Sequence, residues 1–170
     1  TRICLISDAS TDKYCFVEHY NIDDYSKGAD AFKMAYIHMS SNPYDYELIC
    51  FQRWFCIRDF VKTQKIENFL CMDSDVLLYC NIDEVMQQYI SYDFTTCNKQ
   101  GPGCALFNIS SISDFCEYMM SMYTEDILLN KMKSMYQEII DNKQLGGVCD
   151  MVAFVWFQDN TKCNVIDIAI

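Results

Sequence analysis

The residues best suited to chemistry are two aspartates separated by one residue, Asp73 and Asp75. They lie between the apolar run Phe69–Met72 and a second apolar run that begins at Val76. In an extended segment, side chains two positions apart point the same way, and two carboxylates held so close repel each other unless a cation lies between them. Oxygen ligands without His or Cys are typical of Mg²⁺ or Mn²⁺. We therefore expect Asp73 and Asp75 to hold one of these ions.

The surroundings of this Asp-x-Asp sequence carry more information than the tripeptide. A chain this rich in aspartate contains about two such tripeptides by chance. A short buried strand that ends directly at Asp73 is more specific, because α/β proteins bind ligands at the carboxyl ends of their sheet strands. The alternative interpretation is a solvated acidic turn between two strands.

The charge of the chain limits the partners that it can bind unaided. The 170 residues include 13 Lys and Arg and 24 Asp and Glu, which gives a formal net charge of −11. Phosphate backbones need a basic surface, so this charge argues against nucleic acid as a partner and equally against docking on anionic lipid. An anionic substrate would need local shielding, and a bound divalent cation can supply it.

To position Asp73 and Asp75, the chain must build a sheet and helices around them. The expected strands are residues 3–6, 68–72, 92–97, 103–108 and 165–170, with an extended run at 76–79. The expected helices are residues 29–39, 47–63, 82–90, 110–122, 124–140 and 151–157. Ser110 or Ser111 is expected to cap the helix that begins there. This alternation predicts an α/β fold with a mostly parallel sheet flanked by helices. No repeat or linker interrupts the chain, so we expect one domain over residues 1–170.

Cysteine usage and hydropathy favour a cytoplasmic protein. No apolar run reaches the ~18 residues that a membrane-spanning helix needs, so no transmembrane segment is expected. The 11 cysteines include no Cys-x-x-Cys pair, and many lie in apolar strings that suit buried, reduced thiols rather than a structural zinc site. The sequence begins at Thr1 inside a strand-like run, without a Met, so we expect a fragment. The alternative to a purely cytoplasmic protein is one that associates with a membrane, either through its acceptor or through segments that lie outside this fragment.

In its apolar frame, residues 69–78, Asp73-Ser74-Asp75 resembles the DxD motif of nucleotide-sugar glycosyltransferases with the GT-A fold, in particular bacterial polysaccharide-type enzymes. Further similarity is carried by residues 3–8 (ICLISD), 41–55 (SNPYDYELICFQRWF), 101–108 (GPGCALFN) and 147–151 (GVCDM). The similarity spans most of the chain, but only the DxD frame is specific. Within residues 1–170 the chain lacks the first strand of that fold and the later His that often completes its metal site.

The resemblance implies a single GT-A-like domain, with a Rossmann-like nucleotide-diphospho-sugar transferase fold that lacks its first strand and its C-terminal end. It implies a metal-dependent, hexosyltransferase-like enzyme of polysaccharide biosynthesis. Such an enzyme moves a sugar from a UDP- or GDP-sugar donor to a glycan, a lipid-linked molecule or another hydroxyl acceptor. Mn²⁺ or Mg²⁺ on Asp75, with Asp73 on the metal or the ribose, would hold the diphosphate as a leaving group, which is Lewis-acid chemistry.

Three further residues have roles under this interpretation, each with a structural alternative. Arg53, on the helix before the motif, has a planar fork that suits a phosphate, or it stacks on Trp54. Asp8 accepts a hydrogen bond from the base or the ribose, or it forms a turn. Asp150 is the candidate general base for the acceptor hydroxyl in an inverting enzyme. It instead orients the acceptor in a retaining enzyme, or only begins a helix whose dipole favours an acid.

Two other functions stay open from the sequence. Phosphatases of the haloacid-dehalogenase type also place Asp-x-Asp after a buried strand, with the first Asp as nucleophile and the second as acid/base. The position of the motif far from Thr1, and Val76 where a small Gly-Thr step is expected, argue against that function. The other alternative is a non-catalytic module that binds a nucleotide-sugar without turnover.

Overall fold

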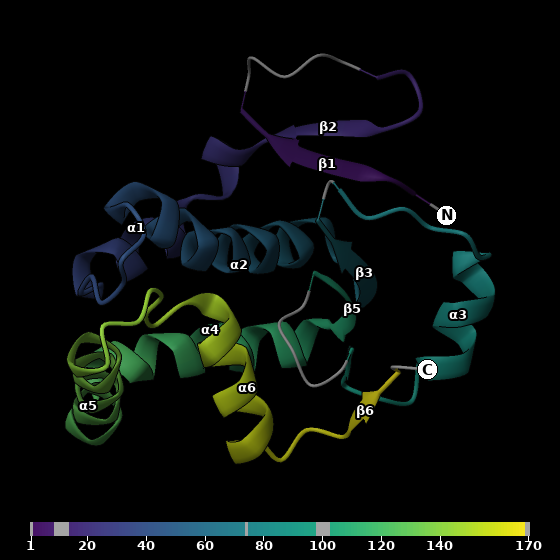
Figure 1. Ribbon diagram of the computed structural model, residues 1–170. Helices are drawn as coiled ribbons and strands as arrows, with labels where there is room; N and C mark the ends of the chain where they lie inside the picture. Colours follow the sequence, from purple (N-terminus) through teal and green to yellow (C-terminus); the bar gives the residue numbers. More distant parts are fainter. Residues whose placement is uncertain (1, 9–13, 74, 98–102, 169–170) are drawn as a thin grey trace.

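The computed structural model describes residues 2–8, 14–73, 75–97 and 103–168 (Figure 1). The strands are β1 (Cys4–Ser7), β2 (Glu18–Asn21), β3 (Asn68–Met72), β4 (Phe94–Thr96), β5 (Cys104–Asn108) and β6 (Val165–Asp167). The helices are a 3-10 helix η1 (Ile22–Tyr25), α1 (Lys27–Ala35), α2 (Tyr44–Gln64), α3 (Ile82–Tyr89), α4 (Ile109–Thr124), α5 (Asp126–Asp141) and α6 (Asp150–Asn160). The architecture is mixed α/β, which confirms the expected class at that level.

The larger sheet is mixed, so the expectation of a mostly parallel sheet is wrong. Its strand order is β3-β5-β4-β6, in which β5 runs antiparallel to both of its neighbours and β4 is parallel to β6. For β4 and β5 the physical reason is the short connection from Thr96 to Cys104, because parallel neighbours need a crossover of about a dozen residues or more. Strands β1 and β2 form a separate parallel pair.

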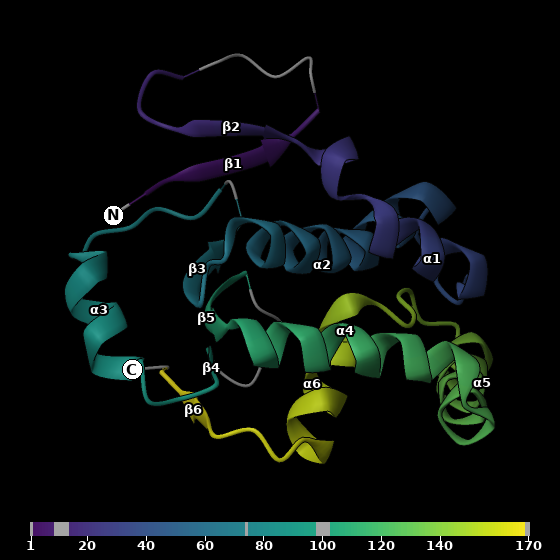
Figure 2. The ribbon, with the colours of Figure 1, turned by 180° about the vertical axis from the view of Figure 1, so that it is seen from behind.

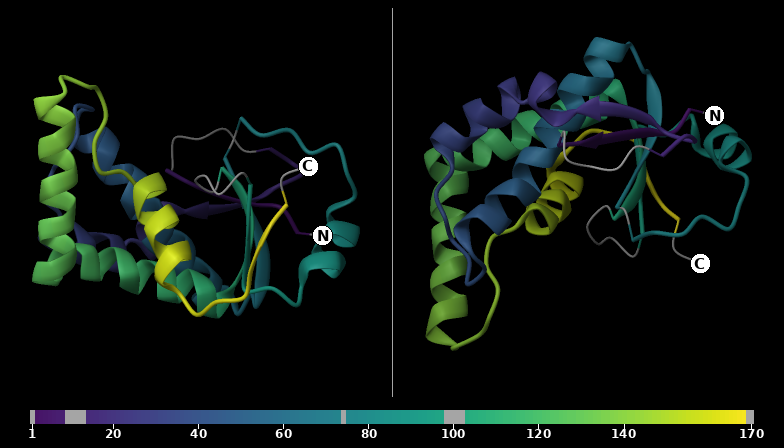
Figure 3. Two further views of the ribbon diagram at one scale, coloured as in Figure 1. Left: turned by 60° about the horizontal axis from the view of Figure 1, so that its bottom comes forward. Right: turned by 90° about the horizontal axis from the view of Figure 1, so that it is seen from above.

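Helices cover the two faces of the larger sheet unequally. Helices α2, α4 and α6 lie on one face and α3 lies on the other, as Figure 1 and the reverse view in Figure 2 show. Figure 3 shows α5 at the end of this helical layer that is farthest from the sheet. The main core therefore lies between the sheet and the layer that contains α2, α4 and α6.

Helix α2 is the central helix of that core. The Trp54 side chain is fully buried, and its ring centroid lies 5.9 Å from that of Phe107 on β5 and 5.5 Å from that of Phe115 on α4. Apolar residues at helical spacing bury one face of a helix, and the helix expected over 47–63 is confirmed with additional residues at both ends. Burial of Trp54 fixes its neighbour Arg53 at the edge of the core.

Some local features differ from the sequence expectations. Strand β2 was not expected because its residues show no apolar alternation; an exposed ion pair of 2.6 Å between Arg2 and Glu18 joins it to the segment before β1. The run at 76–79 joins no strand within the described part of the chain. Helix α4 is capped by Asn108, which forms a reciprocal capping box with Ser111. Across the described ranges, no helix is long and apolar enough to span a membrane.

Candidate functional site

Arg53 joins two carboxylates that lie far apart in the sequence. Its Nη1 donates to Asp73 Oδ1 at 2.7 Å, and its Nη2 donates to Asp150 Oδ2 at 2.9 Å. The Nε1–H of Trp54 also donates to Asp150 Oδ2, at 3.0 Å. We call Arg53, Trp54, Asp73 and Asp150 the Arg53 cluster. It gathers residues from α2, from the end of β3 and from the start of α6.

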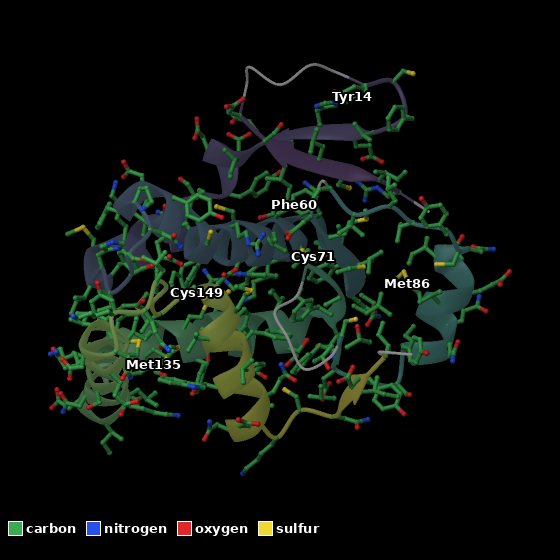
Figure 4. All side chains as sticks on the ribbon, in the orientation of Figure 1. Tyr14, Phe60, Cys71, Met86, Met135 and Cys149 are labelled. Atoms are coloured by element: carbon green, nitrogen blue, oxygen red, sulfur yellow. The ribbon has the colours of Figure 1, made fainter. Side chains whose placement is uncertain are left out.

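Asp73 is held by the backbone of β5. Its N–H donates to the carbonyl oxygen of Gly103 at 2.8 Å, which extends the pairing of β3 and β5 by one residue. A Cβ added to Gly103 would lie 3.5 Å from Asp73 Oδ2, so this carboxylate oxygen rests beside the Gly103 backbone. Cys71, labelled in Figure 4, marks this end of β3. The resemblance segment at 101–108 is therefore adjacent to Asp73 at Gly103, while Gly101 and Pro102 lie outside the described residues.

Asp75 lies in a turn rather than in an extended segment. The N–H of Val76 donates to the carbonyl oxygen of Asp73 at 3.1 Å, which closes the turn. Asp73 is half-buried and Asp75 is exposed, so the two side chains differ in their access to water. The expectation of an extended pair was wrong here, because a turn follows the last paired residue of β3. Ser74 lies outside the described residues.

Asp150 is placed by the turn that precedes α6. Gly147 forms a bridge with Ser40, and the N–H of Val148 donates to the carbonyl oxygen of Met39 at 2.8 Å. Cys149, labelled in Figure 4, then caps α6, and Asp150 is its first residue. Negative charge is favoured in the first turn of a helix, so the position of Asp150 at the start of α6 agrees with the expected helix-dipole contact. Its side chain is 6% exposed.

Electrostatics keep Arg53 charged. Partial burial of its guanidinium lowers the pKa of Arg53, but Asp150 and Asp73 outweigh this cost, and the net effect is a raised pKa. The guanidinium carbon lies 4.8 Å from the ring centroid of Trp54, so the expected stacking is present. The Arg53 side chain is 34% exposed, while its Nε is buried without a hydrogen-bond partner among the described atoms.

Other cations and acids lie outside the cluster. Arg58 is held by Asp59, with Nε 2.8 Å from Oδ1, and lines a pocket of about 450 Å³ between α1 and α2 with Lys27 and Lys62. Arg53 and Arg58 therefore serve different surfaces of α2. Asp8 follows the carboxyl end of β1 and is exposed.

The thiols beside the cluster are not activated. Burial raises the pKa of Cys71 to about 12, and burial together with Asp150 raises the pKa of Cys50 to about 11. Burial also raises the pKa of Cys149. All 11 cysteines are free. A thiol is a poor nucleophile and metal ligand while protonated, so the carboxylates and Arg53 are the chemically useful groups.

The donor set fits a hard cation that completes its shell with other ligands. Within the described ranges, no group of three or more His, Cys, Asp or Glu side chains is placed to hold a metal ion. The oxygen ligands at the expected position are Asp73 and Asp75. Mg²⁺ commonly uses one or two carboxylates and takes its remaining ligands from water and substrate phosphates. The residues present therefore fit Mg²⁺ or Mn²⁺ bound together with a phosphate-bearing ligand.

Sequence reasoning missed the role of Trp54. A buried indole N–H needs an acceptor, so an Arg-Trp pair on an apolar helix was a signal that a carboxylate or carbonyl lies nearby. Which acceptor it would be could not be read from the sequence, because Asp150 is 96 residues away from Trp54.

No family model, curated protein or solved structure matches this chain.

Proposed function

We propose that this chain is the nucleotide-sugar-binding domain of a metal-dependent glycosyltransferase with a GT-A-like fold. The observation that carries the proposal is the Arg53 cluster, which gathers a cation and two aspartates at the carboxyl end of β3. That end of a sheet strand is where α/β proteins bind ligands. The mixed α/β architecture supports the class, and the GT-A assignment is part of the proposal.

Asp73 and Asp75 are the carboxylates that would hold Mn²⁺ or Mg²⁺. When bound, such an ion supplies Lewis-acid stabilisation of the diphosphate leaving group. A UDP- or GDP-sugar carries the phosphate oxygens that a two-carboxylate protein site leaves for the ligand to supply. In a chain with a formal net charge of −11, a diphosphate needs this compensation.

Arg53 is the residue that we assign to the diphosphate. Its guanidinium has five N–H donors, and the two contacts to Asp73 and Asp150 leave others available. A guanidinium fork matches the geometry of a phosphate. Asp8 is assigned to the base or the ribose, because it is exposed directly after a strand.

Asp150 is assigned to the positioning of Arg53 or to proton transfer, and its burial favours positioning. The N–H groups of Arg53 and Trp54 both donate to Oδ2 of Asp150. A general base must reach the acceptor hydroxyl directly or through one water. Asp150→Asn separates the two roles. Loss of transfer with unchanged donor affinity indicates a base, whereas loss of donor affinity indicates a positioning residue.

Turnover tests the proposal. The purified protein is incubated with a panel of UDP- and GDP-sugars, Mn²⁺ and a mixture of saccharide and lipid-linked acceptors, and release of the nucleoside diphosphate is measured. We expect release that needs the metal and is lost in Asp75→Asn. Phosphate release from an aryl phosphate, without nucleotide release, would instead support the phosphatase. Donor binding with no release in any mixture would support the non-catalytic module.

A further inference from the structure

The two ion pairs of Arg53 differ in how far water reaches them. The Asp73 side chain is 39% exposed, whereas that of Asp150 is 6% exposed. At the buried end, Trp54 donates to the same oxygen as Arg53 and lies under the guanidinium. Exposed ion pairs contribute little, while separating a buried one leaves a charge without a partner. Of the two ion pairs of Arg53, the one with Asp73 is therefore the easier to break.

Asp73 is supported without Arg53. Its N–H donates to the carbonyl oxygen of Gly103, and its carbonyl oxygen accepts a hydrogen bond from the N–H of Val76. Both backbone polar groups of Asp73 are therefore hydrogen-bonded. Oδ1 faces Arg53, while Oδ2 lies beside Gly103. Loss of the Arg53 contact would therefore free a carboxylate oxygen while the turn that carries Asp75 stays in place.

The local charge suits a divalent cation. Asp73, Asp75 and Asp150 are three carboxylates, and among the described residues Arg53 is the one cation that pairs with any of them, namely Asp73 and Asp150, which leaves an excess of two negative charges. Asp75 is exposed and forms no ion pair with a described residue. Carboxylate oxygens are the preferred ligands of Mg²⁺ and Mn²⁺. Arg53 and such a cation would need the same oxygen of Asp73.

We propose that Arg53 is an internal counter-ion that occupies Asp73 in the free protein and gives up this contact when a divalent cation and the donor diphosphate bind. It stays anchored to Asp150 and Trp54, and its freed Nη1 donates to a diphosphate oxygen. The diphosphate part of this inference rests on the proposed function. Competition between Arg53 and a divalent cation for Asp73 does not. Cation and diphosphate then bind cooperatively, each raising the affinity for the other by the same factor.

Binding of Mn²⁺ alone tests the competition. Free Mn²⁺ is measured by electron paramagnetic resonance, without nucleotide, for the wild type and Arg53→Gln. We expect Arg53→Gln to bind Mn²⁺ about tenfold more tightly, since a unit charge beside an ionic site shifts its equilibrium by about one to three log units. Adding Asp75→Asn to Arg53→Gln should remove the gain.

The matched control is Arg58→Gln, which removes the same charge from the same helix but from a different partner, Asp59. We expect its Mn²⁺ affinity to stay within about twofold of the wild type, because distant surface charges are screened. Equal affinities for Arg53→Gln and Arg58→Gln, or weaker or absent Mn²⁺ binding by Arg53→Gln, would overturn the proposal.

A second measurement leaves Arg53 intact, in case Arg53→Gln does not fold. The chain has 2 tryptophans, so Trp156→Phe leaves Trp54 as the only indole. Mg²⁺ and a nucleoside diphosphate are titrated together, and Trp54 emission should change and saturate as the guanidinium moves over the ring. Asp75→Asn should abolish the change. Constant emission, whether or not calorimetry detects binding, would contradict the movement of Arg53.

The outcomes separate this inference from the proposed function. If Arg53→Gln binds Mn²⁺ more tightly but no nucleotide-sugar binds, the competition stands and the transferase proposal fails. If a nucleotide-sugar binds with Mn²⁺ but Arg53→Gln leaves the affinity for Mn²⁺ alone unchanged, the transferase proposal stands and the competition fails.

Discussion

Arg53 and Asp150 lie 97 residues apart in the sequence and form an ion pair, with 2.9 Å between Nη2 and Oδ2. The pair ties the middle of α2 to the first turn of α6. Because the same Asp150 oxygen also accepts from Trp54, the core helix and the candidate site share one carboxylate. Changes at this carboxylate should therefore alter stability and ligand binding together.

Asp150→Ala should be strongly destabilising. It leaves Arg53 and the Trp54 indole without their acceptor, and we expect a loss of about 3 kcal/mol, the lower end for broken buried pairs because part of Arg53 reaches water. Urea unfolding at neutral pH measures the change. Asp141→Ala, on the exposed end of α5, is the control and should change the free energy of unfolding by less than about 0.5 kcal/mol. Equal effects of the two substitutions would be incompatible with a structural role for the ion pair.

Trp54→Phe removes the indole hydrogen bond and keeps an aromatic ring in the core. The aromatic contacts with Phe107 and Phe115 are largely kept, but Asp150 loses one donor. A hydrogen bond to a charged group contributes about 1.5–3 kcal/mol, so we expect a loss of about 2 kcal/mol in thermal or urea unfolding.

Trp156→Phe is the matched control for Trp54→Phe. Its ring faces the Lys131 ammonium, 3.7 Å from the ring centroid, at a partly exposed position. Such contacts contribute about 0.5–1 kcal/mol, so this variant should lose less than Trp54→Phe. A larger loss for Trp156→Phe would contradict the assigned role of Trp54.

Gly147→Ala should disturb the turn that places Asp150. An added Cβ would overlap the carbonyl oxygen of Met39 and the Cα of Ser40, which are backbone atoms that cannot move aside easily. We expect a loss of about 2 kcal/mol or more, in the range for overpacked sites. Gly103→Ala is the comparison, because its nearest contact would be Asp73 Oδ2 at 3.5 Å, an ordinary distance. Unfolding curves in urea should rank the two variants in that order.

The half-buried thiols of Cys50 and Cys71 predict a pH dependence of labelling and stability. Burial raises the pKa of Cys71 to about 12 and that of Cys50 to about 11, the latter with help from Asp150. At pH 8, iodoacetamide should therefore label Cys50 and Cys71 more slowly than the exposed Cys15 and Cys97, as measured by peptide mass spectrometry. Faster labelling of Cys71 than of Cys15 would contradict its burial.

The raised pKa values of Cys50 and Cys71 also determine whether the free energy of unfolding rises or falls with pH. A folded-state pKa above the unfolded value of about 8.5 means that the unfolded chain releases these protons first as the pH rises. The stabilisation from keeping Cys50 and Cys71 protonated is complete below about pH 8.5 and is lost as the pH rises toward 11. Urea unfolding at pH 7 and pH 10 measures it, and a Cys71→Ala variant should show a smaller decrease between the two.

The parts of the fold that depend on local apolar patterning could be predicted from the sequence. Strand β3 occupies the residues expected for it, and α2 contains the whole of the helix expected over 47–63. The direction of the sheet could not be predicted in the same way. Alternation of strands with helices says little about which strands become neighbours, and the short Thr96-to-Cys104 connection reverses the chain instead of crossing over.

The candidate site was predictable in its residue types but not in its contacts. Asp73, Asp150 and Arg53 were each selected for separate roles, and the structure joins them directly. No periodicity relates residues so far apart, because their contact depends on how α4 packs against both α2 and α6. Asp75 lies two residues after Asp73, but the turn after β3 leaves the Asp75 side chain exposed while that of Asp73 is half-buried.

The most direct test of the account is whether a nucleotide-sugar binds to this protein through a divalent cation. Thermal unfolding is measured with a panel of UDP- and GDP-sugars, with and without Mn²⁺, for the wild type, Asp75→Asn and the charge-matched control Asp159→Asn. A ligand at 100 times its Kd adds about 2.7 kcal/mol, which raises the Tm of a domain of this size by roughly 5–10 °C. The account predicts a rise that needs both donor and metal, is lost in Asp75→Asn and is kept in Asp159→Asn. No rise with any donor, or a rise that Asp75→Asn retains, would contradict it.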